Sequence, residues 1–436
     1  MWLRVGRAAS AADQARGGLA LDVVLYAVSA LFAAYTAMAS TLAPHRVWGA
    51  IAIAGYGLAA VAALVQLNRH QSAGVRARAW LVGVTWATTA LLPLVIEAIQ
   101  RAAGTAGRAQ EEVIVIEDGG QRLIETGTPY LGRAAIAALD APDRLLGYLP
   151  YQPAMASFGL VRAADPGAHW WSDARVWFAV ATALALGTAL YVLRRAGADP
   201  ARLIRAAQVA TVLPLCALTL ATGGDDLPVL GLCLLAFAFA AARRWGWAGV
   251  ALGAAAALKL FAWPVAIVLG VLALTRGRRA VLRLAAGTLG LPALTLVPAL
   301  IVDASAFVEN VLRFPLGHGL VVSPAQSPLP GYLIATALPD GRYVALGLLA
   351  AAGLAIGVWV IRRPPRTAAA AAVVTGVGLL AALLLLPATR FGYLLYPVAF
   401  LVWAGCLRLP TDEPRVPRQR RRPVTRPQPA PSEPAG

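Results

Sequence analysis

Long apolar runs dominate the chain and predict helices that cross a membrane. Several runs reach about 20 residues, the length that a helix needs to cross roughly 30 Å of hydrocarbon at about 1.5 Å per residue. Short polar segments separate the runs, and together they predict spans at residues 21–40, 47–67, 79–98, 175–193, 206–222, 226–242, 281–301, 343–361, 367–387 and 391–408. We therefore expect an all-α polytopic membrane protein.

The arginines predict how these spans are oriented, because cytoplasmic loops collect positive charge. Alternating spans place 26 of the 37 arginines on one side and 11 on the other, whereas 15 of the 21 acidic residues fall on the arginine-poor side. Arg243 and the arginine cluster at 276–283 then both face the cytoplasm. The apolar stretch 245–275 must therefore leave and return as two short or re-entrant helices, turning near Leu258 and Lys259. This predicts about 12 spans in the plasma membrane, with both termini cytoplasmic.

The same pattern divides the chain into four regions. Residues 1–98 hold N-terminal transmembrane helices, and 99–174 form a long outer loop whose stretch LLGYLPYQPAMASFGL is expected to lie on the bilayer surface as an amphipathic segment. Residues 175–408 form a transmembrane core that contains a second outer loop at 302–342. The Pro- and Arg-rich tail at 409–436 is expected to be disordered and cytoplasmic.

Composition narrows the function classes. The chain is 59% hydrophobic and 14% charged, and its net charge of +17 is explained by membrane orientation, so nucleic acid is not an expected partner. The three cysteines lie in apolar runs and are interpreted as buried small residues. The sequence shows no paired-cysteine metal site, Walker loop, HExxH or nucleophile elbow. We expect no metal and no cofactor, and any donor substrate must arrive from the membrane.

Lys259 is the only lysine in the chain, and it lies inside an apolar stretch. A lysine at bilayer depth costs roughly 2.5–3.5 kcal/mol on insertion scales, so an interaction must offset that cost. One interpretation is a side chain that snorkels from the outer end of a short helix. The other is an anion ligand facing a cavity, since a compact point charge suits phosphate oxygens.

The acidic candidates lie in the predicted outer segments. Asp118 follows a span and precedes the turn-rich sequence GTPY, so it is either a solvated loop charge or a group held against the helices. Asp140 and Asp143 are weaker candidates in the same loop. Asp225 and Asp226 lie in the turn TGGDDLP, where we interpret them as caps of the helix that begins near Pro228.

Two cationic candidates accompany these carboxylates. His318 lies in the second outer loop, where it is either a surface residue or a hydrogen-bond donor to phosphate. Arg390 lies in the last outer turn, and Tyr393 and Tyr396 follow it at helical spacing. Outer arginines are scarce, which favours a role for Arg390 beyond marking the membrane interface.

Four stretches resemble the membrane-embedded C-type glycosyltransferases, specifically the polyprenyl-phosphate-mannose-dependent α-mannosyltransferases of glycosyltransferase family 87. The stretches are EDGGQRLIETGTPY, YLPYQP, WGWAGVALGAAAALKLFAWP and RFGYLLYP. The chain departs from the family pattern where the Asp-bearing loop follows the third span, so that residues 1–98 resemble an added or rearranged group of helices.

The resemblance implies a GT-C-like fold and transfer of a sugar, with inversion, from a polyprenyl-phosphate donor to a lipid or glycan acceptor on the outer face. It implies that Asp118 is the catalytic base and that Lys259 and Arg390, with His318 as a third group, bind the donor phosphate. It also implies that the substrate contacts tyrosines within these stretches, namely Tyr130, Tyr151 and Tyr393. Asp118, Lys259 and Arg390 should then line one cavity.

Two other interpretations remain open at this point. A polytopic transporter or lipid flippase would use Lys259 as a substrate or coupling residue. A structural membrane scaffold would leave the buried lysine unexplained.

Overall fold

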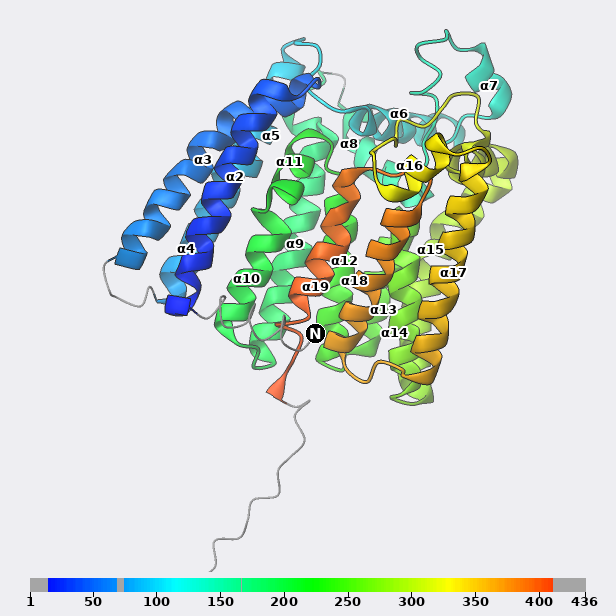
Figure 1. Ribbon diagram of the computed structural model, residues 1–436. Coiled ribbons are helices and arrows are strands. Elements are labelled where there is room, and N and C mark those ends of the chain that lie inside the picture. Colours follow the sequence, from blue (N-terminus) through cyan, green and yellow to red (C-terminus); the bar gives the residue numbers. More distant parts are fainter. Residues whose placement is uncertain (1–14, 69–73, 166, 411–436) are drawn as a thin grey trace, which may run out of the picture.

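The computed structural model describes residues 15–68, 74–165 and 167–410, which fold into an array of helices (Figure 1). Three of the arginines counted on the predicted cytoplasmic side, Arg4, Arg7 and Arg69, lie outside the described residues. So does the predicted basic tail from residue 411 onward.

Within the described part, seven helical segments are long and apolar enough to cross a membrane. They are Leu19–Ala39 (α2), Ala43–Asn68 (α3), Val75–Ala102 (α4, η2 and α5), Ala174–Arg195 (α9), Arg278–His318 (α15 and η6), Gly341–Arg362 (α17) and Ala368–Leu385 (α18). An eighth is the pair α10 (Pro200–Thr211) and α11 (Pro214–Thr222), which is bent by 43°. The all-helical, multi-pass prediction is confirmed.

Four shorter apolar helices coincide with the remaining predicted spans. They are Asp226–Ala241 (α12), Trp245–Leu258 (α13), Leu260–Leu274 (η5 and α14) and Phe391–Trp403 (η7 and α19). The structure thus contains a helix at each predicted position, while seven or eight of them meet the length of a full span. A total of about 12 crossings requires the four shorter helices to cross the membrane as well, and that stays a prediction.

The predicted break in the 245–275 stretch is confirmed. Helix α13 ends at Leu258, Lys259 is extended with φ −153° and ψ 145°, and the chain returns through η5 (Leu260–Ala262) and α14 (Trp263–Leu274). Glycines seat this hairpin against α15 (Arg278–Phe307), because a Cβ atom at Gly253 would lie 2.0 Å from the carbonyl oxygen of Gly287. Only glycine permits this backbone contact.

Both long connections lie at one end of the array (Figure 1). They contain α6 (Glu111–Thr126), α7 (Arg133–Ala138), η3 (Pro153–Gly159), α8 (Leu160–Ala163), η4 (Trp170–Ser172), η6 (Val308–His318) and α16 (Pro330–Ala337). The stretch expected to lie on the bilayer surface packs against the rest of the protein, because Leu149, Met155 and Ala156 are fully buried. These three apolar side chains therefore contribute to the protein interior, and the bilayer-surface position stays a prediction.

Helix α6 is fixed by a buried charge and a backbone contact. The carboxylate of Glu117 accepts hydrogen bonds from both terminal nitrogens of Arg101 (2.9 and 2.7 Å) and from the backbone N–H of Ala174 (3.0 Å). Further along, a Cβ at Gly120 would lie 2.4 Å from the carbonyl carbon of Gly159, so the two segments touch through their backbones. These contacts hold the middle of α6 against the helical array.

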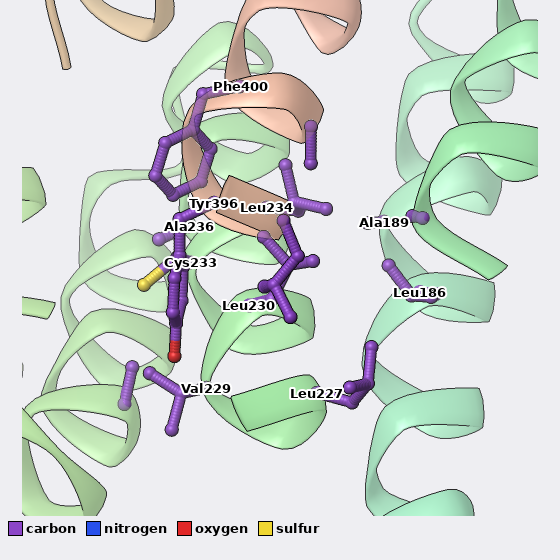
Figure 2. Close-up of a cluster of buried hydrophobic side chains, with 14 of the residues drawn as sticks. Leu186, Ala189, Leu227, Val229, Leu230, Cys233, Leu234, Ala236, Tyr396 and Phe400 are labelled. Carbon is purple, nitrogen blue, oxygen red and sulfur yellow. The ribbon is translucent and has the colours of Figure 1, made fainter. Parts of the chain in front are cut away.

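Helix α12 forms the centre of the hydrophobic core between α9 and α19. In Figure 2, Leu227 and Leu230 of α12 lie toward Leu186 of α9, and Cys233 lies beside Tyr396 of α19. Cys233 is a free, buried thiol, as are Cys216 and Cys406. This core sets the position of Tyr396, whose hydroxyl reaches the polar site.

Candidate active site

A cavity of about 820 Å³ contains most of the ionisable groups that the sequence indicated. Its walls come from the C-terminal half of α2, the first turn of α6, α11, the start of α12, the α13–η5 break and the segment before η7. Its polar lining includes His45, Gln110, Glu111, Glu112, Tyr151, Asp225, Asp226, Lys259, Arg390 and Tyr393. The volume falls in the range of small-molecule sites, which is about 300–1,000 Å³.

Lys259 projects into this cavity because the chain is extended at the end of α13. Its Nζ lies 2.8 Å from Asp225 Oδ2 and 2.5 Å from Asp226 Oδ1. The nitrogen also lies over the rings of Tyr151 and Tyr393, 5.0 and 5.3 Å from their centroids. Paired charges and aromatic faces offset the desolvation of the ammonium, so the lysine is a buried site residue and does not snorkel.

Asp225 and Asp226 correct an interpretation made from the sequence. We expected them to cap the following helix, but neither side chain makes a capping hydrogen bond to α12. Both carboxylates turn to Lys259, and Tyr396 donates a hydrogen bond of 2.7 Å to Asp226 Oδ1. A buried ammonium without carboxylate partners costs several kcal/mol, and that demand exceeds the value of a cap.

Arg390 forms the second cationic point of the cavity, in an ion pair with Glu112. Glu112 lies in the first turn of α6, so the pair joins the first long connection to the segment before η7. The arginine segment is held by two further hydrogen bonds, in which Ser327 N–H donates to the carbonyl of Thr389 (2.9 Å) and Phe391 N–H donates to Ser327 Oγ (2.9 Å). Arg390 therefore lies on an anchored segment.

Glu111 also lines the cavity, and among the described residues it forms no ion pair. Burial raises the pKa of this carboxyl, and the neighbouring Glu112 raises the pKa further. The positive charge of Arg390 lowers the pKa of Glu111. An unpaired carboxylate whose pKa is raised is better suited to accept a proton than one already neutralised by a cation.

Asp118 lies elsewhere, and the prediction that it shares a cavity with Lys259 and Arg390 is wrong. It borders a separate hollow of about 410 Å³, with its side chain 51% exposed and 3.8 Å from Arg122. The physical reason is the helix itself: seven residues from Glu111 displace Asp118 by about 10 Å along the axis of α6. The first turn of α6 faces the cavity and the second half does not.

The other predicted residues divide in the same way. Tyr151 and Tyr393 line the cavity, but His318 and Tyr130 do not. His318 lies at the end of η6, where its carbonyl accepts a hydrogen bond from Arg133 (3.2 Å). Tyr130 is buried, and its hydroxyl donates a hydrogen bond to the backbone carbonyl of Tyr151 (2.7 Å). It therefore holds the backbone of Tyr151 without lining the cavity itself.

The sequence analysis did not single out Glu111 and Glu112, and it interpreted Asp225 and Asp226 as helix caps. The carboxylates of Glu111, Glu112, Asp225 and Asp226 occur as adjacent pairs in predicted outer segments, and a lone membrane lysine requires acidic partners, so the signal was present. His45 was also missed; its Nε2 lies 2.7 Å from Gln110 Nε2 at the cavity wall. Among the described residues, no three His, Cys, Asp or Glu side chains are grouped so as to hold a metal ion.

Comparisons with known proteins bear on this cavity. The family model described as glycosyltransferase family 87 matches residues 148–387, more than half of the chain. That range includes Lys259, Asp225 and Asp226, whereas α2, α6 and Arg390 lie outside it. No curated protein matches the chain in sequence.

Among solved structures, ArnT from Cupriavidus metallidurans in the apo state is similar to this chain. The TM-score is 0.41 and the sequence identity 17%, over 68% of this chain and 54% of that one. The chain thus covers about half the length of that protein.

Proposed function

Because the chain belongs to glycosyltransferase family 87, we propose that this membrane glycosyltransferase moves a sugar from a polyprenyl-phosphate donor to an acceptor hydroxyl on the extracytoplasmic face, with inversion. The observation that carries the proposal is the single cavity in which Lys259 and Arg390 lie among carboxylates. Mannose is the sugar that we propose, since the four sequence stretches resemble the mannose-dependent members of the family. The acceptor is a lipid or a glycan.

The two cations support the role of phosphate binding. Departure of the sugar leaves a polyprenyl phosphate, already a stable anion, so cationic groups that hold the phosphate suffice and no strong acid is required. Lys259 supplies a point charge in the cavity wall, and Arg390 supplies a planar group with several donors. As the bond between the anomeric carbon and the phosphate oxygen breaks, both cations stabilise the growing negative charge.

Inversion also requires a base, and we propose Glu111 for this role in place of Asp118. The carboxylate takes the proton of the acceptor hydroxyl as that oxygen attacks the anomeric carbon from the side opposite the phosphate. Glu111 lines the same cavity as both cations, and burial and the neighbouring Glu112 raise its pKa, which strengthens it as a proton acceptor. Asp118, by contrast, lies in a different hollow beside Arg122.

The proposal is tested with purified protein in lipid vesicles and a panel of sugar donors. We expect transfer from polyprenyl-phosphate mannose, and an anomeric configuration in the product opposite to that of the donor by NMR. Nucleotide sugars should support no transfer. Transfer from nucleotide sugars alone, or a product that keeps the donor configuration, would contradict the proposal.

A further inference from the structure

The start of α6 carries two of the acidic residues that line the cavity, and it follows an exposed connection. Residues 103–107 are exposed, and Gly104 and Gly107 adopt positive φ there. Glu111 and Glu112 are the first two residues of α6. An exposed connection with few packed side chains gives these residues little support from that direction. The contacts of the residue before them therefore matter for where their carboxylates lie.

That residue is Gln110, the N-cap of α6, and it is bonded through both its backbone and its side chain. Its N–H donates to the carbonyl of Thr222 (2.9 Å), and its Oε1 accepts a hydrogen bond from Thr222 Oγ1 (3.3 Å). A Cβ at Gly223 would lie 2.5 Å from that oxygen, so the amide packs closely against the backbone there. Thr222 ends α11 three residues before Asp225. Gln110 thus joins the start of α6 to the segment that pairs with Lys259.

His45 holds the other end of the same amide. It lies in the first turn of α3, and its Nε2 lies 2.7 Å from Gln110 Nε2. The amide oxygen faces Thr222, so the amide nitrogen donates to the ring and the imidazole accepts through its Nε2 lone pair. This contact is a hydrogen bond between two neutral groups.

The helix that carries His45 is itself firmly packed. Trp48, three residues further along α3, is fully buried and donates a hydrogen bond to the carbonyl of Thr89 (2.8 Å). A Cβ at Gly49 would lie 2.6 Å from the carbonyl oxygen of Ala33, so α3 and α2 touch through their backbones. His45 therefore presents its ring from a fixed support.

Arg390 also holds the start of α6, through its ion pair with Glu112. A donor phosphate at Arg390 competes with Glu112 for the guanidinium, so this support weakens when the donor binds. The neutral contact between His45 and Gln110 does not compete with phosphate for a cation. It therefore persists when the donor is bound.

We propose that His45 is a positioning residue for the transfer reaction, acting on Glu111 through Gln110. It keeps the base in place while the donor phosphate occupies Arg390. The inference rests on the proposed function, because a general base contributes only when its carboxylate lies within hydrogen-bond reach of the acceptor hydroxyl. His45 lies outside the range 148–387, so this role belongs to a part of the chain that the family model does not match.

The first test removes the ring nitrogen and then restores a polar atom near its position. His45→Phe keeps an aromatic ring but offers Gln110 no acceptor, whereas His45→Gln places an amide near the position of Nε2 and His45→Asn is too short. We expect His45→Phe and His45→Asn to lower kcat about tenfold with KM for the donor within about twofold, because the base acts in the transition state. His45→Gln should keep kcat within about threefold of the wild type.

His169→Phe is the matched control, since it removes the ring hydrogen bond of a histidine outside the cavity lining. His169 Nδ1 lies 2.8 Å from Asp165 Oδ1, and the His169 side chain is 59% exposed. This variant should leave both kcat and KM within about twofold. The same kcat in all three His45 variants, or a raised donor KM with an unchanged kcat, would overturn the inference.

A double variant shows whether His45 acts through the base. Once Glu111→Gln has removed the carboxylate, its position no longer matters. Adding His45→Phe should then slow transfer by less than about twofold. Losses that multiply would show that His45 acts on another group and would overturn the inference.

A further measurement does not depend on transfer. Hydrogen exchange of the full chain in detergent reports on the start of α6, where Val113 N–H donates to the carbonyl of Gln110 (3.1 Å). We expect His45→Phe to speed exchange in peptides covering 108–116 about threefold or more and to leave 117–126 unchanged, since only the first turn loses a contact. Gln110→Met breaks the same contact from its other partner and should give the same local pattern, which covers a His45→Phe protein that fails to fold.

Unchanged exchange at 108–116, or faster exchange throughout the protein, would overturn the inference. The two levels of the proposal fail differently. Absent transfer from any polyprenyl-phosphate sugar contradicts the proposed function, while the exchange result still decides whether His45 holds the start of α6. Normal transfer in the wild type with no effect of His45→Phe contradicts the positioning role alone.

Discussion

The two cations of the cavity are held in different ways. The side chains of Lys259, Asp225 and Asp226 are 7%, 4% and 7% exposed, and the ammonium touches both carboxylates and two tyrosine rings. Arg390 and Glu112 are 32% and 13% exposed, and each is the other's only ion-pair partner among the described residues. The lysine cluster is a fixed, desolvated unit, whereas the arginine pair borders open space.

This difference indicates how an anionic donor binds. At Lys259 two carboxylates already face one ammonium. A phosphate that replaced both would leave buried charges unpaired, and we expect one that joins them to need the charge of Arg390 as well. At Arg390 it competes with a single, partly exposed carboxylate, and exchange there is cheap. We therefore expect Lys259 to position a bound donor phosphate and Arg390 to contribute affinity.

The largest effect is expected when the fixed unit loses its cation. Lys259→Met leaves Asp225 and Asp226 buried without a cationic partner, which costs about 3–5 kcal/mol of folding free energy. Transfer should fall about a thousandfold, because the group that stabilises the departing phosphate is also lost. Thermal unfolding in detergent and the transfer assay measure the two effects.

A compensating variant separates these effects. Adding Asp226→Asn to Lys259→Met removes one unpaired charge, so stability should partly return while transfer stays absent. Recovery of both folding stability and transfer would show that Lys259 acts through folding alone. That result would contradict the proposed difference between the two cations.

A smaller loss is expected at the proposed base. Glu111→Gln should lower kcat about 100-fold or more and leave KM for the donor nearly unchanged, because a general base acts in the transition state. The isosteric change at the next residue, Glu112→Gln, frees Arg390 and serves as the matched control with much smaller loss of kcat. Equal kcat losses for the two variants would contradict the assignment.

The same carboxylate predicts the pH dependence of the wild type. The pKa of Glu111 is raised, and the base acts only when it is ionised. Activity should therefore rise with pH through a pKa above the ordinary glutamate range, and this acidic limb should vanish in Glu111→Gln. A limb that persists in the variant would assign the titration to another group.

A moderate effect is expected at the partly exposed pair. Arg390→Ala should raise KM for the donor about tenfold with little loss of folding stability, since exposed ion pairs contribute about 0–1 kcal/mol. Arg390→Lys keeps the charge and should recover part of the affinity. A thousandfold loss of transfer in Arg390→Ala would show that transfer depends on Arg390 as strongly as on Lys259. That result would contradict the proposed difference between the two cations.

The smallest effect is expected outside the cavity. Asp118→Asn should keep transfer within about twofold of the wild type, because this carboxylate lies in the second hollow beside Arg122. The same assay compares it directly with Glu111→Gln. Loss of transfer in Asp118→Asn with normal activity in Glu111→Gln would restore Asp118 as the base.

The sequence by itself determined the positions of the membrane helices, the break at Lys259 and the family. Apolar run length and arginine placement are local, one-dimensional signals, and the desolvation cost of a lone lysine identifies it without any partner. Of the three residues expected to share a cavity, Lys259 and Arg390 do so and Asp118 does not. The match over 148–387 agrees with the resemblance seen in the sequence.

Only the tertiary structure decided which carboxylates face those cations. Glu111 and Asp118 lie on one helix seven residues apart, and no local signal tells which turn lies over the cavity. Asp225 and Asp226 fit a helix cap equally well until α13 brings Lys259 beside them. Pairing between charges 33 and 34 residues apart depends on how helices pack, which the order of residues along one helix does not specify.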